Sequence, residues 1–186
     1  MGEIKSFIKN PNAWGVKHYE KWKGKLSGSE RLGMHEYLGA GYTKINSVLR
    51  ESKGTKINDD IKAVDSALNK TKPPGTPHEI LVRRGLDSGG GKHIDLSTLR
   101  AGSVFIDHGF MSTTASGAVG GAFKGDVEFQ ITVPKGARGA YITQSLAVVQ
   151  GESEFLLPRG SKLKIGKVTK TGSRHVVEAT VIEDTE

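Results

Sequence analysis

The residues of this 186-residue sequence best suited to chemistry are the two glutamates of Glu152-Ser153-Glu154. If residues 154–157 are extended, Glu152 lies in the loop before a strand and Glu154 opens that strand on the same side. Two carboxylates at one site suit a reaction through an oxocarbenium ion, because one can steady the sugar through its 2-hydroxyl while the other handles the acceptor. Taken alone, the motif is equally compatible with two surface glutamates.

A guanidinium group is expected at the end of the apolar run Ile80-Leu81-Val82, where Arg83, Arg84 and Gly85 follow. Arginine suits bidentate contact with a phosphate, and a glycine lets the backbone approach a ligand closely. The alternation of a strand and the glycine that follows favour Arg84 over Arg83 for such a contact. In isolation, an arginine at a strand end is more often part of a surface ion pair.

Three successive hydroxyl groups stand in Ser112-Thr113-Thr114, directly after the apolar pair Phe110-Met111. Such a run can hydrogen-bond a catalytic carboxylate and the backbone of a neighbouring strand, although hydroxyl-rich edge strands without a function are common. The glycine-rich residues 117–125, which include Phe123, are typical of a loop that folds over a ligand.

Helices are expected to precede these motifs. Apolar residues recur every three or four positions in residues 29–50, after serines at 27 and 29 that can cap, with a break expected near Gly39-Ala40-Gly41. Residues 57–68 repeat the pattern, with Asn58 or Asp59 as the cap, until Pro73-Pro74-Gly75 ends it.

A period of two follows and predicts short strands. They are expected at residues 80–84, 104–114 with a turn at His108-Gly109, 127–133, 140–142, 154–157, 162–168 and 175–182. Helices followed by strands predict an α+β fold, with N-terminal helices packed on a strand-rich two-sheet core. We expect a single domain over residues 1–186, in which 1–75 form a helical annex and 76–186 form the β-rich catalytic core.

The composition excludes several kinds of protein. With no cysteine, the chain has neither disulfides nor thiolate metal sites, and its six histidines lack metal-ligand spacing, so no metal is expected. No run is long and apolar enough for a membrane span or a secretory signal. Residues 1–75 hold 14 Lys and Arg against 8 Asp and Glu, a basic excess that is most often a solvated helical face.

The three clusters together resemble the ADP-ribosyltransferase exoenzyme family, bacterial toxins typed by an arginine, a Ser-Thr-Ser strand and a Glu-x-Glu motif in that order. Here Arg84-Gly85, Ser112-Thr113-Thr114 and Glu152-Ser153-Glu154 follow in the same order at similar spacing. Residues 42–50, YTKINSVLR, resemble the family's Tyr-x-x-Ile-Asn-x-x-Leu-Arg helix, which packs over the NAD site. The resemblance covers most of the chain and implies an ADP-ribosyltransferase fold.

The same resemblance implies that NAD⁺ is the co-substrate and assigns a role to each catalytic residue. Arg84 grips the phosphates and Ser112 orients the catalytic glutamate. Glu154 contacts the nicotinamide ribose and stabilises the oxocarbenium ion as nicotinamide leaves, and Glu152 selects and activates the acceptor. The residues expected to bind NAD⁺ are Arg84, Arg83, Gly85, Ser112, Thr113, Asn46, Tyr42, Phe123 and Glu154.

The acceptor expected from the resemblance is an arginine of a target protein, because a glutamate at position 152 goes with arginine acceptors in this family. The chemistry agrees, since a guanidinium with a pKa above about 12 needs a carboxylate to orient it and take its proton. A toxin of this kind is secreted or injected and acts in the cytoplasm of a target cell, and an immunity or delivery partner is compatible with that role.

Three departures and three alternatives accompany this hypothesis. Thr114 replaces the last serine of the family motif, a second arginine precedes Arg84 where an aromatic-arginine step is frequent, and residues 145–151 lack the aromatic that many relatives carry. The alternatives are an NAD⁺ glycohydrolase, an enzyme that modifies nucleic-acid bases, and a basic nucleic-acid-binding module. The base-modifying enzyme is disfavoured by Glu152, and nucleic-acid binding is not expected because no recognition motif is present.

Overall fold

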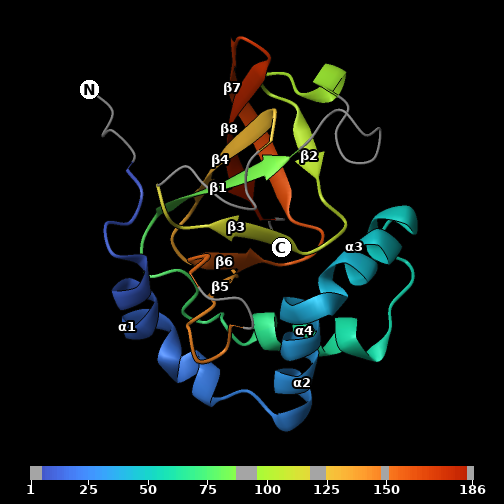
Figure 1. Ribbon diagram of the computed structural model, residues 1–186, viewed down its shortest axis with the longest axis vertical. Coiled ribbons are helices and arrows are strands. Elements are labelled where there is room, and N and C mark those ends of the chain that lie inside the picture. The colour runs from blue at the N-terminus through green and yellow to red at the C-terminus, as the bar shows by residue number, and fades with distance from the viewer. Residues whose placement is uncertain (1–5, 87–95, 118–124, 148–150, 184–186) are drawn as a thin grey trace.

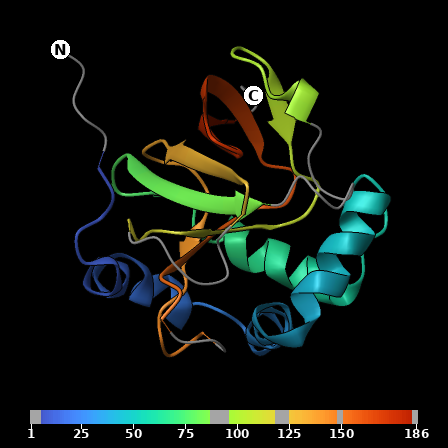
Figure 2. The same ribbon diagram turned by 45° about the horizontal axis from the view of Figure 1, so that its top comes forward.

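The computed structural model describes residues 6–86, 96–117, 125–147 and 151–183. In this part of the chain the helices come first and lie along one side of a sheet (Figures 1 and 2). They are α1 (Pro11–Gly24), α2 (Gly28–Glu36), α3 (Tyr42–Glu51) and α4 (Asp59–Asn69), with a π-helical segment η1 (Tyr37–Gly41) between α2 and α3. A short 3₁₀ helix η2 (Leu96–Thr98) comes later in the chain, between the first two strands, and lies apart from the other helices (Figure 1).

The helix boundaries follow from local capping. Ser27 caps α2 in a reciprocal pair with Glu30, whose backbone N–H donates to the serine hydroxyl over 3.2 Å. Asn58 caps α4 by accepting from the N–H of Ile61 over 2.8 Å. The break expected near residues 39–41 is confirmed, because Gly39 has a non-helical backbone (φ −89°, ψ −122°). It turns α3 out of line with α2.

The strands are β1 (Ile80–Leu86), β2 (Val104–Ile106), β3 (Met111–Thr114), β4 (Val127–Val133), β5 (Ala140–Tyr141), β6 (Glu154–Leu157), β7 (Lys162–Thr171) and β8 (Arg174–Ile182). Their order in the sheet is β2-β7-β8-β4-β1-β3-β6-β5. All neighbouring pairs are antiparallel except β4 and β8, which run parallel. The expected α+β fold with N-terminal helices on a strand-rich core is confirmed.

The two expected sheets are joined into one hydrogen-bonded sheet at a narrow junction. Strands β1 and β4 pair along seven residues, whereas β1 and β3 pair only through Arg83 and Thr114. A five-stranded part (β2-β7-β8-β4-β1) therefore meets a three-stranded part (β3-β6-β5) at a single residue pair. Alternation in the sequence predicts the strands but does not reveal this one contact between them.

The core joins the helices to the three-stranded part. Trp14 and Tyr19 of α1 pack against Phe155 of β6 with ring centroids 6.4 and 5.9 Å apart, and Trp14 also lies 6.2 Å from the ring of Tyr141 on β5. Helix α1 approaches β5 closely at Gly15, where an added Cβ would lie 2.0 Å from the Tyr141 ring. Burial of each such aromatic contributes about 2 kcal/mol, so α1 is firmly held beside the strand that carries Glu154.

Candidate active site

A cleft of about 370 Å³ opens between the helical face of η1 and α3 and the junction of the two sheet parts. Arg84 comes from β1, Ser112 from β3 and Glu154 from β6, so the cleft gathers residues from both sides of the junction. Its lining consists of Tyr37, Leu38, Gly39, Tyr42, Thr43, Asn46, Ser47, Arg50, Arg84, Gly85, Ser112, Glu152 and Glu154.

Helix α3 turns one face to the cleft through Tyr42, Asn46 and Arg50, which are four residues apart and therefore lie above one another. Tyr42 is half exposed at the rim, whereas Asn46 is buried. The helix approaches the turn between β2 and β3 closely at Gly109, where an added Cβ would lie 2.8 Å from Asn46 Oδ1. The glycine is thus needed for the helix to reach the strands.

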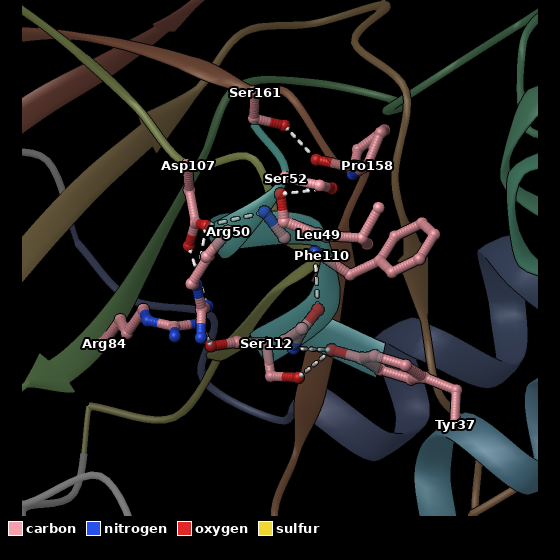
Figure 3. A network of polar contacts seen from close by, with 12 residues as sticks. Tyr37, Leu49, Arg50, Ser52, Arg84, Asp107, Phe110, Ser112, Pro158 and Ser161 are labelled. Atoms are coloured by element: carbon pink, nitrogen blue, oxygen red, sulfur yellow. Dashed lines mark hydrogen bonds and ion pairs between the residues drawn. The ribbon is translucent and has the colours of Figure 1, made fainter. Parts of the chain in front are cut away.

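Polar contacts connect α3 and η1 to the strand of Ser112, and Figure 3 shows several of them. The N–H of Phe110 donates to Asn46 Oδ1 over 2.9 Å, and Asn46 Nδ2 donates to Tyr37 Oη over 3.1 Å. The Tyr37 hydroxyl lies 3.2 Å from the Ser112 hydroxyl, and hydrogen bonding from Ser112 helps to lower the pKa of Glu154 on the paired strand β6. The carboxylate is therefore linked to the helical layer through side chains alone.

Two guanidinium groups form the cationic end of the site (Figure 3). Arg50 binds both carboxylate oxygens of Asp107, over 3.0 and 3.1 Å, while Arg84 Nη1 donates to the carbonyl of Ser112 over 3.1 Å. Burial lowers the pKa of Arg84, Asp107 raises it and Arg50 lowers it again. Because the single carboxylate of Asp107 lies close to two guanidinium groups, this end of the cleft keeps a net positive charge that suits an anion.

Glu154 is a buried carboxylate with an altered protonation equilibrium. Burial raises its pKa to about 7, with a further upward contribution from Glu152, while the Ser112 hydrogen bond and the charge of Arg84 lower it. Burial also raises the pKa of Glu152. Glu154 is thus shared between its protonated and ionised forms near neutral pH, as suits a group that responds to charge developing beside it.

The backbone of the Glu-x-Glu segment is held in an unusual conformation. Ser153 has a φ of +48°, which non-glycine residues seldom adopt. The N–H of Ala115 donates to the carbonyl of Ser153 over 2.9 Å, and the Thr114 hydroxyl donates to the carbonyl of Glu152 over 3.0 Å. The end of β3 therefore holds both glutamates in place.

Not all of the residues predicted to bind NAD⁺ line the cleft. Tyr42, Asn46, Arg84, Gly85, Ser112 and Glu154 do, as does Glu152, which was predicted to handle the acceptor. The side chain of Arg83 is directed elsewhere, because successive residues of a strand face opposite sides, and it is buried in an ion pair with Glu128 at 3.1 Å. The Thr113 hydroxyl is likewise buried and donates to the carbonyl of Phe155 over 2.6 Å. Phe123 lies outside the described residues.

Tyr37, Arg50 and Asp107 were not among the predicted site residues. Arg50 ends the helical motif of residues 42–50 and has a spacing of four from Asn46, a signal that places it on the same face. Tyr37 and Asp107 carry no comparable signal, since their partners Ser112 and Arg50 are 75 and 57 residues away.

Within the described ranges, no group of three or more His, Cys, Asp or Glu side chains is arranged to hold a metal ion. The helices of the same ranges include none that is long and apolar enough to cross a membrane.

A family model described as ADP-ribosyltransferase exoenzyme matches residues 11–184. The chain belongs to this family. The resemblance noted in its motifs is thereby confirmed, and the protein is a member of a group of bacterial ADP-ribosyltransferase toxins.

Three relatives illustrate the range of the ADP-ribosyltransferase exoenzyme family around this member. The epidermal cell differentiation inhibitor of Staphylococcus aureus is 24% identical over 216 residues, covering 97% of this chain and 84% of the relative. The C3 exoenzyme of Clostridium limosum shares the fold with a TM-score of 0.80 at 23% identity, covering 97% and 98% of the two chains. The NAD(+)–arginine ADP-ribosyltransferase EFV of Enterococcus faecalis is 26% identical over 175 residues, which are 88% of this chain but only 33% of that protein.

Proposed function

We propose that this family member transfers ADP-ribose from NAD⁺ to an arginine side chain of a target protein and releases nicotinamide. The observation that carries the proposal is the buried carboxylate of Glu154, which lies in one cleft with Ser112, Arg84 and Glu152. Arg84 comes from β1, Ser112 from β3 and Glu154 from β6, while Glu152 lies in the loop before β6. They are the four residues to which the family resemblance assigns catalysis.

Arg84 and Arg50 are proposed to hold the diphosphate of NAD⁺. Arg84 Nε is buried and, among the described residues, lacks a hydrogen-bond partner, so it remains available to a ligand. Gly85 lines the cleft beside it and allows a phosphate to approach the backbone. Tyr42, half exposed at the rim, offers an aromatic face for one of the rings of the dinucleotide. The donor set therefore fits an anionic dinucleotide.

Glu154 is proposed to stabilise the ribose as its bond to nicotinamide breaks. The bonding electrons leave with nicotinamide, and the ionised carboxylate offsets the positive charge that develops on the sugar. Glu154 Oε2 is buried without a partner among the described residues, so one oxygen is free for a ribose hydroxyl. The positive charge of nicotinamide in bound NAD⁺ favours the ionised form of Glu154, whose pKa of about 7 otherwise leaves it partly protonated near neutral pH.

Glu152 is proposed to orient the acceptor guanidinium and to receive its proton when the new carbon–nitrogen bond forms. A carboxylate is required because the neutral guanidine is otherwise too rare to attack. Burial raises the pKa of Glu152, which makes it a better base than an exposed glutamate. The E. faecalis relative, an NAD(+)–arginine ADP-ribosyltransferase, supports the same acceptor.

We further propose that residues 1–186 act as one catalytic domain, because the cleft needs both the helical annex (1–75) and the strand-rich core (76–186). Its partner would be a target protein with an accessible arginine, met in the cytoplasm of a cell into which the toxin is secreted or injected. An immunity or delivery partner fits the same role.

The proposed function is tested by incubating the protein with labelled NAD⁺, cell lysate and, separately, a small guanidine acceptor. Label on arginine, located by mass spectrometry of modified peptides, would support the transferase. Free ADP-ribose alone would instead support the glycohydrolase. Glu154→Gln should abolish both transfer and NAD⁺ cleavage, while Glu152→Gln should abolish transfer and spare cleavage. Full transfer by the Glu154→Gln protein would refute the assignment.

A further inference from the structure

We infer, building on the proposed function, that Tyr37 and Asn46 are positioning residues that aim the Ser112 hydroxyl at Glu154. Neither needs to touch NAD⁺ to do so. They form a hydrogen-bond chain from the backbone N–H of Phe110 through Asn46, Tyr37 and Ser112 to the carboxylate. When Glu154 is ionised, the hydrogen bonds of this chain can all run in one donor direction, and that direction ends on Glu154.

The direction is set by the backbone of Phe110. A backbone N–H can only donate, so the side-chain atom of Asn46 that lies 2.9 Å from it must be the oxygen. The amide nitrogen of Asn46 then faces Tyr37 Oη at 3.1 Å and donates to it. One amide group of the main chain thus removes the choice between the two orientations of the Asn46 side chain.

The same reasoning carries the direction to the carboxylate. Tyr37 Oη accepts from Asn46, so its own hydrogen is free to point at Ser112 Oγ, 3.2 Å away. Ser112 Oγ, having accepted from Tyr37, directs its hydrogen to Glu154, because an ionised carboxylate can only accept. A serine hydroxyl alone can rotate among three positions, and the tyrosine selects the one that stabilises the ionised glutamate.

Burial protects this hydrogen-bond chain from competing water. Tyr37 and Asn46 are 1% and 5% exposed, so water does not compete for their hydrogen-bonding groups. The oxygen and one amide hydrogen of Asn46 are used in hydrogen bonds within the protein, and the Tyr37 hydroxyl both accepts from Asn46 and donates to Ser112. Asn46, which the sequence suggested as an NAD⁺ contact, is thereby assigned to the support of Glu154.

The variant that isolates this effect is Tyr37→Phe, which removes one hydroxyl and no charge. The charged or titratable groups that face Glu154 are Glu152 from its own segment, Arg84 from β1 and Tyr37 from η1. The two other charges remain in the variant. We expect kcat for NAD⁺ cleavage to fall about tenfold, the usual effect of a lost hydrogen bond that acts on a charged group, with KM for NAD⁺ changed less than about twofold.

A double-mutant cycle separates support through Ser112 from any other role. In a Ser112→Ala background, Tyr37→Phe should lower kcat by less than about twofold, because the residue through which it acts is already gone. Tyr19→Phe is the matched control, since Tyr19 is also buried but its hydroxyl has no partner among the described residues. It should leave kcat unchanged.

A readout without turnover completes the test. In protein labelled with ¹³C at glutamate carboxyl carbons, the Glu154 pKa should rise in Tyr37→Phe and stay constant in Tyr19→Phe. In the unaltered protein, the Tyr37 hydroxyl proton should show an Overhauser effect to the Ser112 β protons, which checks the direction even if the variant does not fold.

Three results would overturn the inference: equal loss of kcat from Tyr37→Phe in both backgrounds, an unmoved Glu154 pKa, or a Tyr37 hydroxyl proton that points at Asn46. If the unaltered protein cleaves no NAD⁺, the proposed function fails, yet the titration and the Overhauser effect still decide the inference.

Discussion

The high pKa of Glu154 predicts that its removal makes the protein more stable as well as inactive. In the unfolded chain the group ionises near 4.5, while in the folded protein burial raises its pKa to about 7. Below pH 4.5 the folded and unfolded states both hold the proton and no penalty exists. As the pH rises from 4.5 to 7, the unfolded chain releases the proton while the folded protein still holds it, so stability is lost, and the loss levels off above pH 7, where the buried group is ionised in the folded protein too. That loss amounts to about 3 kcal/mol.

Glu154→Gln should escape this penalty. Its amide still accepts from Ser112 but leaves one buried hydrogen-bonding group unpaired, so we expect a net gain of roughly 1 to 3 kcal/mol in the free energy of unfolding at pH 8. At pH 4.5 the gain should vanish. Urea unfolding of both proteins at the two pH values measures the difference, and subtraction of one protein from the other cancels all other titrating groups.

A difference in stability that is the same at pH 4.5 and pH 8 would refute the reasoning, because it would show that the substitution acts without ionisation. The same ionisation predicts the activity profile of the unaltered protein. Its kcat/KM for NAD⁺ should rise with pH and level off above about 7, since only the ionised Glu154 stabilises the oxocarbenium ion.

Three further predictions concern other parts of the structure. Burial opposes the ionisation of Glu30, but hydrogen bonds from Lys70, Ser27 and Ser66 lower its pKa to about 2. Glu30→Gln should therefore cost about 2 kcal/mol of unfolding free energy at pH 7, and progressively less as the pH falls from 4.5 towards 2, which urea unfolding at pH 7 and at a pH near 2 will measure. Asp107→Asn loses the bidentate partner of Arg50 and should lower the thermal midpoint by a few degrees; an unchanged midpoint would contradict its supporting role. Gly15→Ala should destabilise by more than about 1 kcal/mol through its clash with Tyr141, whereas Gly24→Ala, at a position with nothing within 4 Å, should not.

Much of the strand layout was predictable because alternation and turn residues are local signals. The expected strand at residues 154–157 coincides with β6, and those at 80–84 and 175–182 lie within β1 and β8. The preference for Arg84 over Arg83 at the cleft also follows from alternation, and the structure directs only Arg84 into it. These features depend on neighbours in the sequence.

The features that were missed depend on residues far apart in the chain. The Arg50–Asp107 pair and the Tyr37–Ser112 contact form only after α3 and η1 have packed on the strands. Helix α1 was not delimited either, because apolar spacing at its start is interrupted by lysines and glycine. The pairing of Arg83 with Thr114 is set by tertiary packing, and no local sequence pattern specifies it.

The narrow junction between β1 and β3 has a mechanical consequence. The five-stranded part, which carries Arg84, and the three-stranded part, which carries Ser112 and Glu154, are joined only by this junction. Because a single residue pair joins the two parts of the sheet, its hydrogen bonds alone fix the angle between them only weakly. Helix α3 fixes this angle further, because Arg50 and Asn46 both hydrogen-bond the chain at residues 107–110, where it passes from the five-stranded part to the three-stranded part. We therefore expect helix α3, although it is not part of the sheet, to set the distance between the two walls of the cleft.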